Sequence, residues 1–293
     1  MTIYLNGEYI PKEQANCDLS FDGGVFETMR AYRGRIFKLH EHIRRLFMSA
    51  RFLRMNISYT GEQLEGICCN VLENAGLEGA SVRISIAKRN TDRNVCATLG
   101  GMTHASSLLV QHSGNEDLLV IVSPLPFREP HEWGYYEQGV TITTTSLTKQ
   151  PPLPQAKSSN FLPGVIARAE TNRDNLFEVV FLNRHGFVTE GTVSNIFMVK
   201  NGLLITPPTY LGLLSGIARQ CVLEIAMQTG VKHKQVPFTR YDLFTADEVF
   251  LTNSTIEILP VSVVDGRMIG DGIAGEISRG LREGYKQMVG KYR

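Results

Sequence analysis

The chain has 293 residues, of which 43% are hydrophobic and 20% are charged, and its formal net charge is +1 at pH 7. A chain so close to neutral lacks the basic surplus that favours binding to nucleic acid or to an anionic membrane surface. It begins without a basic n-region and an apolar run, and no stretch approaches the roughly 20 apolar residues that span a bilayer.

The first part of the chain alternates strand patterns with two helices. Thr2–Leu5 and Glu8–Ile10 flank an Asn-Gly turn, which predicts a hairpin. Val25–Tyr32 alternates as a strand does, and Leu39–Met55 repeats its apolar residues with helical spacing. Gly61–Ala75 predicts a second helix, because a threonine precedes it and a glutamine follows three residues later, as in a capping box.

The next strands predicted are Ser81–Ala87 and Leu118–Val122. The long connection between them, 89–116, is typical either of a functional lid or of a surface insertion without a role. The three prolines of Pro124–Pro130 predict a linker between domains. The expected division is a small N-terminal domain (1–124), a linker (125–133) and a larger C-terminal domain (134–293).

The larger domain is predicted to be rich in sheet. Strand patterns occur at 140–145, 178–182, 195–199, 203–205 and 248–251. Helical patterns occur at 161–172, 216–229 and 272–289. A small α/β domain followed by a sheet-rich domain predicts an α+β fold class.

The cysteines predict neither a disulfide framework nor a metal site. Their number is odd and their spacing fits no zinc site: Cys17, Cys68, Cys69, Cys96 and Cys221. Cys68 and Cys69 fall in an apolar helical stretch, where cysteine acts as a small hydrophobe. A reducing, cytoplasmic compartment fits this usage.

Lys157 lies between a constrained segment and a predicted helix. Pro151–Pro154 precedes it, and Ser158–Asn160 could cap the helix that follows. A lysine that attacks a carbonyl carbon must lose its proton, so it needs surroundings that disfavour charge. The alternative is a solvated loop lysine, which is the more common role of this residue type.

Glu190 lies in a Gly- and Thr-rich turn within Thr189–Phe197, between two apolar strands. An ionised carboxylate there could keep a pyridine nitrogen protonated, and the alternative is an exposed turn glutamate. Asn195 begins the next predicted strand, where its side chain could hold this turn.

Leu214–Arg219 has the pattern of a helix N-terminus. Ser215 is a good N-cap, and Gly216 lets a ligand approach the backbone. The first amides of such a helix suit a phosphate dianion, although a plain capped helix is the alternative. Thr252–Thr255, with its small hydroxyl side chains after a strand, is a second candidate for phosphate binding.

A lysine, a carboxylate and a phosphate cradle in this order are the groups needed to hold pyridoxal 5′-phosphate (PLP). In these segments the chain resembles the class IV PLP-dependent aminotransferases, which include branched-chain and D-amino acid aminotransferases and aminodeoxychorismate lyases. The resemblance covers nearly the whole chain. Further segments that carry it are Asn6-Gly7, Gly24–Arg30, Glu41–Leu46 and Thr255–Val261.

The resemblance implies a two-domain, fold type IV homodimer that moves an amino group between an amino acid and a 2-oxo acid, such as 2-oxoglutarate, by a ping-pong mechanism. Lys157 would be the catalytic Schiff-base lysine, and Glu190 the partner of the pyridine nitrogen. The implied cofactor contacts are Arg45, Lys157, Glu190, Ser194, Asn195, Gly216, Ile217, Ala218, Ser254 and Thr255. The implied substrate contacts are Phe26, Thr28, Arg83, Thr255 and Ile256.

The sequence leaves the substrate open. Phe161 stands where branched-chain enzymes usually have a tyrosine, and Thr28 stands where they tend to have a glycine. These departures are closer to the D-amino acid and lyase branches. Tyr32–Leu53 is closer to the branched-chain relatives, which favours that branch slightly. Candidates to bind a second substrate carboxylate are Arg83, Arg89, Arg93 and His104. A PLP-binding protein without turnover is an alternative of another class.

Overall fold

The computed structural model describes residues 1–14, 23–88, 118–126, 134–171 and 176–291, which form two compact units. The first unit is Met1–Pro126 with Lys157–Asn160, and the second is Phe127–Ala156 with Phe161–Arg293. The four residues Lys157–Asn160, called the lysine segment below, therefore pack with the first unit although both of their chain neighbours belong to the second. Among the described helices, none is long and apolar enough to cross a membrane.

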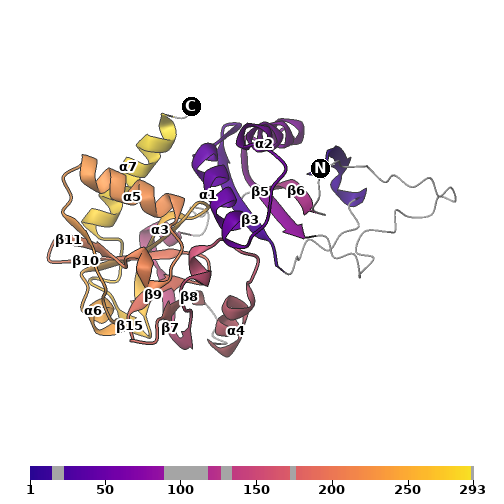
Figure 1. Cartoon of the computed structure of the whole chain (residues 1–293). Coiled ribbons are helices and arrows are strands. Elements are labelled where there is room, and N and C mark those ends of the chain that lie inside the picture. Colours follow the sequence, from indigo (N-terminus) through magenta and orange to yellow (C-terminus); the bar gives the residue numbers. More distant parts are fainter. Residues whose placement is uncertain (15–22, 89–117, 127–133, 172–175, 292–293) are drawn as a thin grey trace, which may run out of the picture. The chain divides into compact units, whose positions relative to one another are not determined.

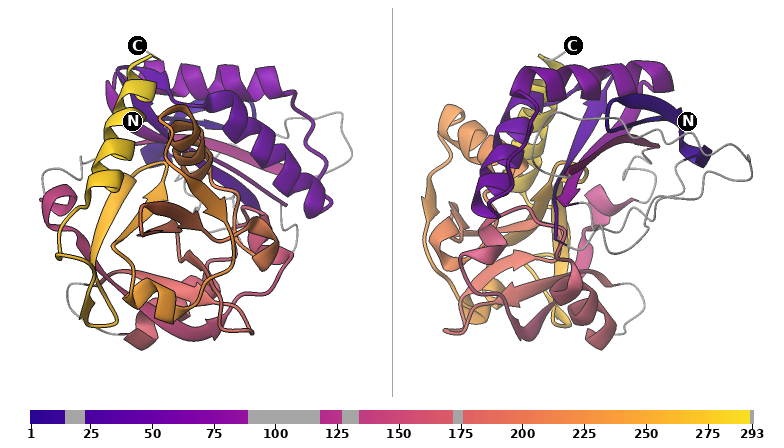
Figure 2. Two further views of the ribbon diagram at one scale, coloured as in Figure 1. Left: turned by 90° about the vertical axis from the view of Figure 1, so that its left-hand side faces the viewer. Right: turned by 45° about the vertical axis from the view of Figure 1, so that its right-hand side comes forward.

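The first unit is a six-stranded antiparallel sheet on which two helices pack (Figures 1 and 2). The strand order is β2-β1-β6-β5-β3-β4. The bounds of its elements are β1 Thr2–Leu5, β2 Glu8–Pro11, the 3-10 turn η1 Lys12–Gln14, β3 Val25–Tyr32, β4 Arg35–Ile36, α1 Leu39–Phe52, α2 Gly61–Ala75, β5 Gly79–Lys88 and β6 Leu118–Pro126.

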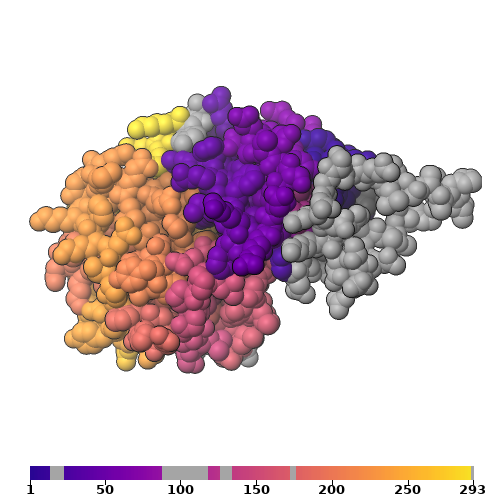
Figure 3. All heavy atoms as spheres, in the orientation of Figure 1, coloured from indigo at the N-terminus to yellow at the C-terminus, as the bar shows by residue number. Residues whose placement is uncertain are grey.

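Helix α2 is present as predicted, and α1 is shorter than expected. The capping box at the start of α2 is present, with Thr60 and Gln63 exchanging hydrogen bonds. Helix α1 ends at Phe52 rather than Met55, because Arg54 adopts a left-handed backbone with φ 54° that no α-helix can continue. Arg44 and Met48 are exposed on α1, and the violet atoms of the first unit form part of the surface seen in Figure 3.

Strand β6 continues through Pro126, two residues into the segment that the prolines predicted as a linker. It pairs with β5 along its whole length, but its pairs with β1 involve only Ile121 and Val122. Beyond Val122 its other edge therefore has no partner strand among the described residues, and prolines without an N–H are tolerated there. The rest of the predicted linker, 127–133, lies outside the described residues.

The second unit contains a mixed nine-stranded sheet in the order β12-β11-β10-β13-β14-β7-β8-β9, with β15 paired to β14. Its strands are β7 Val140–Thr148, β8 Leu176–Leu182, β9 Val188–Gly191, β10 Asn195–Lys200, β11 Leu203–Thr206, β12 His233–Gln235, β13 Glu248–Asn253, β14 Glu257–Val264 and β15 Arg267–Met268. Its helices and 3-10 turns are α3 Tyr135–Gln138, η3 Leu153–Gln155, α4 Leu162–Thr171, η4 Thr209–Leu211, α5 Ile217–Gln228, α6 Arg240–Phe244 and α7 Glu276–Gly290.

All five strands predicted for this unit are present, and the α+β class is confirmed. The sequence pattern missed β9, β12, β14 and β15. Helix α7 begins at Glu276 rather than residue 272, because a side chain from β13 fixes its start: the carboxylate of Glu248 accepts hydrogen bonds from the amides of Ile277 and Ser278 at 2.9 and 2.8 Å. Helices α5 and α7 pack on each other and on β13.

Candidate functional site

The lysine segment pairs with the residues that lead into β3. The amide of Phe26 donates to the carbonyl of Lys157 at 3.1 Å, and the amide of Ser159 donates to the carbonyl of Gly24 at 2.8 Å. The hydroxyl of Ser159 accepts from the amide of Gly24 at 2.9 Å, so this side chain secures the segment to β3, although the sequence suggested a helix cap. Gly24 also lies close to β5, where a Cβ would be 2.5 Å from the carbonyl oxygen of Ile86, so this position requires glycine.

Lys157 is fixed from a second direction by α1. Its amide donates to the hydroxyl of Ser49, which is buried, at 3.0 Å. Its Nζ lies 4.5 Å from the centre of the Phe26 ring, and the Cζ of Arg83 lies 4.2 Å from the same centre. Both cationic groups therefore contact one aromatic ring, which brings two of the predicted site residues close to Lys157.

A buried carboxylate on β3 binds two side chains of α1. The guanidinium of Arg45 donates to Glu27 through Nε and Nη2, both at 2.7 Å, and Nδ1 of His42 lies 2.7 Å from the same carboxylate. Glu27, His42 and Arg45, called the charged cluster below, have side chains that are 0%, 1% and 11% exposed. Burial alone would raise the pKa of Glu27, but Arg45 and His42 outweigh it and lower the pKa to about 2.

At pH 7 His42 is neutral, because its pKa is lowered below the ordinary value of about 6.5. Burial lowers its pKa against the opposing charge of Glu27, and the nearby charges of Arg45 and Lys157 lower it further. An ionised carboxylate can only accept hydrogen bonds, so Nδ1 of His42 carries the proton and donates it to Glu27. Neither Glu27 nor His42 is among the site residues predicted from the sequence, although both belong to the segments that carry the family resemblance.

In the second unit, Glu190 lies on strand β9 and not in a turn as expected, and it is 7% exposed. Its Oε1 accepts from Nζ of Lys149 at 3.2 Å, and its Oε2 accepts from the amide of Leu214 at 2.9 Å. Nζ of Lys149 also lies 4.3 Å from the centre of the Phe181 ring. Lys149 is thus a partner of Glu190 that the sequence did not reveal, because it lies 41 residues away along the chain.

The turn after β9 (192–194) is held by a second buried carboxylate, Glu178 on β8, which is 0% exposed. Its oxygens accept from the hydroxyls of Thr192 and Ser194 at 2.6 and 2.9 Å and from the amide of Val193 at 3.2 Å. Nη2 of Arg168 donates to it at 2.8 Å. Ser194 therefore orders this turn, and Glu178 is a further residue that the sequence pattern did not indicate.

The N-terminus of α5 carries no side-chain cap. Its N-cap is Gly216 and not Ser215, whose hydroxyl accepts from Nε2 of Gln220 instead. Nδ2 of Asn195 donates to the carbonyl of Leu214 at 2.9 Å, so Asn195 acts on the residues before the helix rather than on the turn after β9. A Cβ on Gly216 would overlap Oδ1 of Asn195, which requires glycine here. The amides of Ile217 and Ala218 begin the helix and have no intrahelical acceptor.

The loop between β13 and β14 is ordered by Asn253. Its Oδ1 accepts from the amide and hydroxyl of Thr255, both at 2.8 Å, and from the amide of Ile256 at 2.9 Å. Its Nδ2 donates to the carbonyl of Val193 at 3.2 Å, which ties this loop, including Ser254, to the turn after β9. The structure thus brings together the predicted residues of the second unit from three separate loops.

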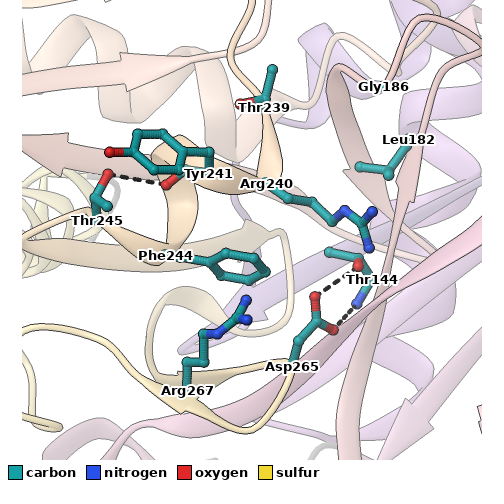
Figure 4. A pocket seen from close by; sticks show the side chains of 10 residues that line it. All are labelled: Thr144, Leu182, Gly186, Thr239, Arg240, Tyr241, Phe244, Thr245, Asp265 and Arg267. Carbon is teal, nitrogen blue, oxygen red and sulfur yellow. Dashed lines mark hydrogen bonds between the residues drawn. The ribbon is translucent and has the colours of Figure 1, made fainter.

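A pocket of about 950 Å³ in the second unit contains none of the predicted site residues (Figure 4). It is lined by residues of β7, β8, α6 and the β14–β15 hairpin, and the only carboxylate in its lining is that of Asp265. The Asp265 carboxylate is bound by the hydroxyls of Thr143 and Thr144 and by the amide of Thr144. Arg89, Arg93 and His104, the rivals of Arg83, lie outside the described residues, as does the 89–116 connection.

Residues 24–264 match the family described as amino-transferase class IV. A Methanocaldococcus jannaschii protein with the provisional name branched-chain-amino-acid aminotransferase is 35% identical over 100% of this chain and 98% of its own. A D-alanine aminotransferase of Listeria monocytogenes is 29% identical over 99% and 96% of the two chains. A solved T.th. branched-chain amino acid aminotransferase with pyridoxamine 5′-phosphate gives a TM-score of 0.83 at 30% identity, covering 100% of this chain and 95% of the other.

Proposed function

Because the chain belongs to the class IV aminotransferases, we propose that it moves an amino group from a branched-chain L-amino acid to 2-oxoglutarate in two half-reactions. Its cofactor is pyridoxal 5′-phosphate. The observation that carries the proposal is the anchoring of Lys157, whose amide and carbonyl are bound by α1 and β3 while its amino group lies against Phe26.

The residues of this chain fit that cofactor. PLP needs a lysine, a carboxylate for its ring nitrogen and an anion site for its phosphate. Lys157 and Glu190 supply the first two, and the uncapped, glycine-led N-terminus of α5 supplies amides that suit a phosphate. When bound, the cofactor withdraws electrons from the substrate Cα and so makes its proton acidic.

Lys157 would hold the cofactor covalently and move the proton between the substrate Cα and the cofactor carbon C4′. Such a transfer is fast only when the base is held within hydrogen-bonding reach of the proton. The main-chain bonds of Lys157 to Phe26 and Ser49 restrict the position of its Cα, which supports this role.

Glu190 would bind the protonated pyridine nitrogen. The amide of Leu214 and the Nζ of Lys149 both donate to its carboxylate and fix its orientation. Asn195 adds support from the other side of Leu214, by binding its carbonyl oxygen.

The phosphate would be bound by Arg45, the amides of Ile217 and Ala218 after Gly216, and the hydroxyl of Thr255, with Ser194 and Ser254 in the supporting loops. Asn253 orients the Thr255 hydroxyl and the Ile256 amide by binding both. The Ile256 amide would donate a hydrogen bond to the substrate carboxylate.

Arg83 would bind the second carboxylate of glutamate or 2-oxoglutarate. Its Cζ lies 4.2 Å, and Nζ of Lys157 lies 4.5 Å, from the centre of the same Phe26 ring. The distance between these two atoms therefore cannot exceed the sum of the two values. Thr28 lies opposite Arg83 in the β3–β5 register and would line the same substrate site. Burial lowers the pKa of Arg83, as expected for a guanidinium withdrawn from water.

A half-reaction tests the proposal. The holoenzyme is mixed separately with L-leucine, L-glutamate, D-alanine, D-glutamate and aminodeoxychorismate, and the visible band of the bound cofactor is followed. Bleaching by L-leucine and L-glutamate is the expected result. Bleaching by D-amino acids alone, an outcome favoured by Thr28, Phe161 and the 29% identity to a D-alanine aminotransferase, would contradict it. Pyruvate release from aminodeoxychorismate with the band retained would indicate a lyase.

Homodimeric assembly and a cytoplasmic location are parts of the same proposal. Sedimentation velocity tests the first, and a fully active monomer would contradict it.

A further inference from the structure

The charged cluster is more elaborate than the folding of the first unit requires. Glu27 lies on the same strand as Val25 and Met29, which belong to the hydrophobic core, and its side chain is 0% exposed. Burying a carboxylate and a guanidinium costs hydration energy, and apolar residues of similar volume often stabilise a fold as well or better. Stability alone therefore does not account for a buried ion pair at this position.

The cluster fixes the plane of the Arg45 guanidinium. Glu27 binds it through the Nε–Nη2 edge, with both distances at 2.7 Å, so the side-chain torsions of Arg45 are restrained. The Nη1 atom belongs to the side of the guanidinium that is turned away from Glu27. An arginine held in this way binds an anion with little further loss of side-chain entropy.

His42 fixes the carboxylate in turn. Its protonated Nδ1 donates to Oε2 of Glu27, the oxygen that also accepts from Nη2 of Arg45. His42, Arg45 and Ser49 follow one another along α1 at spacings of three and four residues, so they share one face of the helix. Because Ser49 binds the amide of Lys157, α1 sets the positions of Arg45 and Lys157 together.

From this geometry we propose that Glu27 and His42 are positioning residues, which orient the Arg45 guanidinium toward the cofactor phosphate and so set the preference for the phosphorylated cofactor. The proposal rests on the phosphate-binding role of Arg45 in the proposed function. Neither residue touches the reacting atoms, and their effect passes through Arg45.

The test compares PLP with pyridoxal, which lacks the phosphate. Dissociation constants of both are measured by visible absorption after dialysis of the holoenzyme against each compound. Glu27→Gln keeps the shape of the side chain but loses its charge and one acceptor oxygen. It is expected to lower the preference for PLP over pyridoxal about tenfold, with pyridoxal affinity nearly unchanged. A variant with only a structural defect would bind both compounds more weakly, by similar factors.

Arg45→Gln and the double variant Glu27→Gln/Arg45→Gln complete a mutant cycle. If Glu27 acts through Arg45, Glu27→Gln lowers the preference no further once Arg45 is replaced. Arg44→Gln is the matched control, since Arg44 is the exposed neighbour of Arg45 on the same helix. This variant should prefer PLP over pyridoxal by the same factor as the parent protein.

A second pair of variants keeps the test decisive if Glu27→Gln does not fold. His42→Asn retains a donor near the position of Nδ1, whereas His42→Leu has a similar volume and no donor. The preference for PLP should fall more in His42→Leu than in His42→Asn. An unchanged preference in Arg45→Gln would refute the phosphate role itself. A reduced preference in Arg45→Gln, without a change in Glu27→Gln or His42→Leu, would refute only the positioning role.

Discussion

The two units each contain a fully buried glutamate, and the two glutamates are used differently. Glu27 in the first unit binds side chains of one helix, and both of its partners are ionisable. Glu178 in the second unit binds hydroxyls and an amide of a single turn, together with Arg168 at the surface. The first carboxylate therefore orients a cation, and the second determines the path of the backbone.

This difference predicts different consequences of mutation. Replacing a member of the charged cluster should change how an anion is bound and how the unit responds to acid. Replacing Glu178 should loosen the turn after β9 and, through Asn253, the loop that carries Thr255.

Lys157→Ala should have the largest effect. It removes both the covalent anchor and the group that moves the Cα proton, so kcat/KM should fall by more than about 10³-fold. The half-reaction with L-leucine measures this loss. Lys232→Ala, which removes an exposed lysine of the second unit, should leave the rate unchanged. Comparable losses in both variants would contradict the assignment.

Acid should destabilise the first unit through the charged cluster. Because the pKa of Glu27 is lowered to about 2, its contribution to stability is complete above its unfolded pKa of about 4.3 and is lost as the pH falls toward about 2. The lowered pKa of His42 acts in the same direction, since the unfolded chain takes up that proton below about pH 6.5.

Glu27→Gln should therefore flatten the acid part of the stability curve. The difference should be on the order of 3 kcal/mol between about pH 5 and about pH 2, followed by urea unfolding with circular dichroism. Equal pH dependence in the parent protein and the variant would contradict the lowered pKa of Glu27.

Glu178→Gln should lower the stability of the second unit near pH 7. It weakens charge-assisted hydrogen bonds to the turn after β9, at a cost of about 2 kcal/mol in the free energy of unfolding near pH 7. Urea unfolding measures the change. Glu170→Gln, in an exposed carboxylate of α4, is the control. Full stability of Glu178→Gln would show that the turn does not depend on this carboxylate.

Arg83→Met should give the smallest effect and the most selective one. It removes the proposed fork for a second carboxylate, so KM for 2-oxoglutarate should rise about tenfold while KM for a branched-chain 2-oxo acid stays the same. Steady-state kinetics with both acceptors measures the ratio. Equal changes for the two acceptors would assign the second carboxylate to another residue.

Local pattern was sufficient to predict much of the fold. The capping box before α2, the apolar stripe of α1 and the Asn-Gly hairpin all depend on residues within one turn or one element, and each is present. Strands β9 and β12 were missed because they are short and partly polar. Residue preference alone favours Ser215 as the N-cap of α5, whereas the N-cap is Gly216 and the Ser215 hydroxyl accepts from Gln220.

The residues that bind each site side chain could not be predicted in this way. Lys149 meets Glu190, and Ser49 meets Lys157, across 41 and 108 residues of sequence, so no local spacing connects them. The roles of Lys157, Glu190 and Arg45 followed from the family resemblance, and they stay predictions until tested.

The assignment of Lys157 is tested by reduction of the holoenzyme with borohydride, followed by digestion and mass spectrometry. This treatment fixes the cofactor to the lysine that holds it. We expect a phosphopyridoxyl label on the peptide containing Lys157. A label on Lys149 or on another lysine, or none at all in a protein that still transfers amino groups, would contradict it.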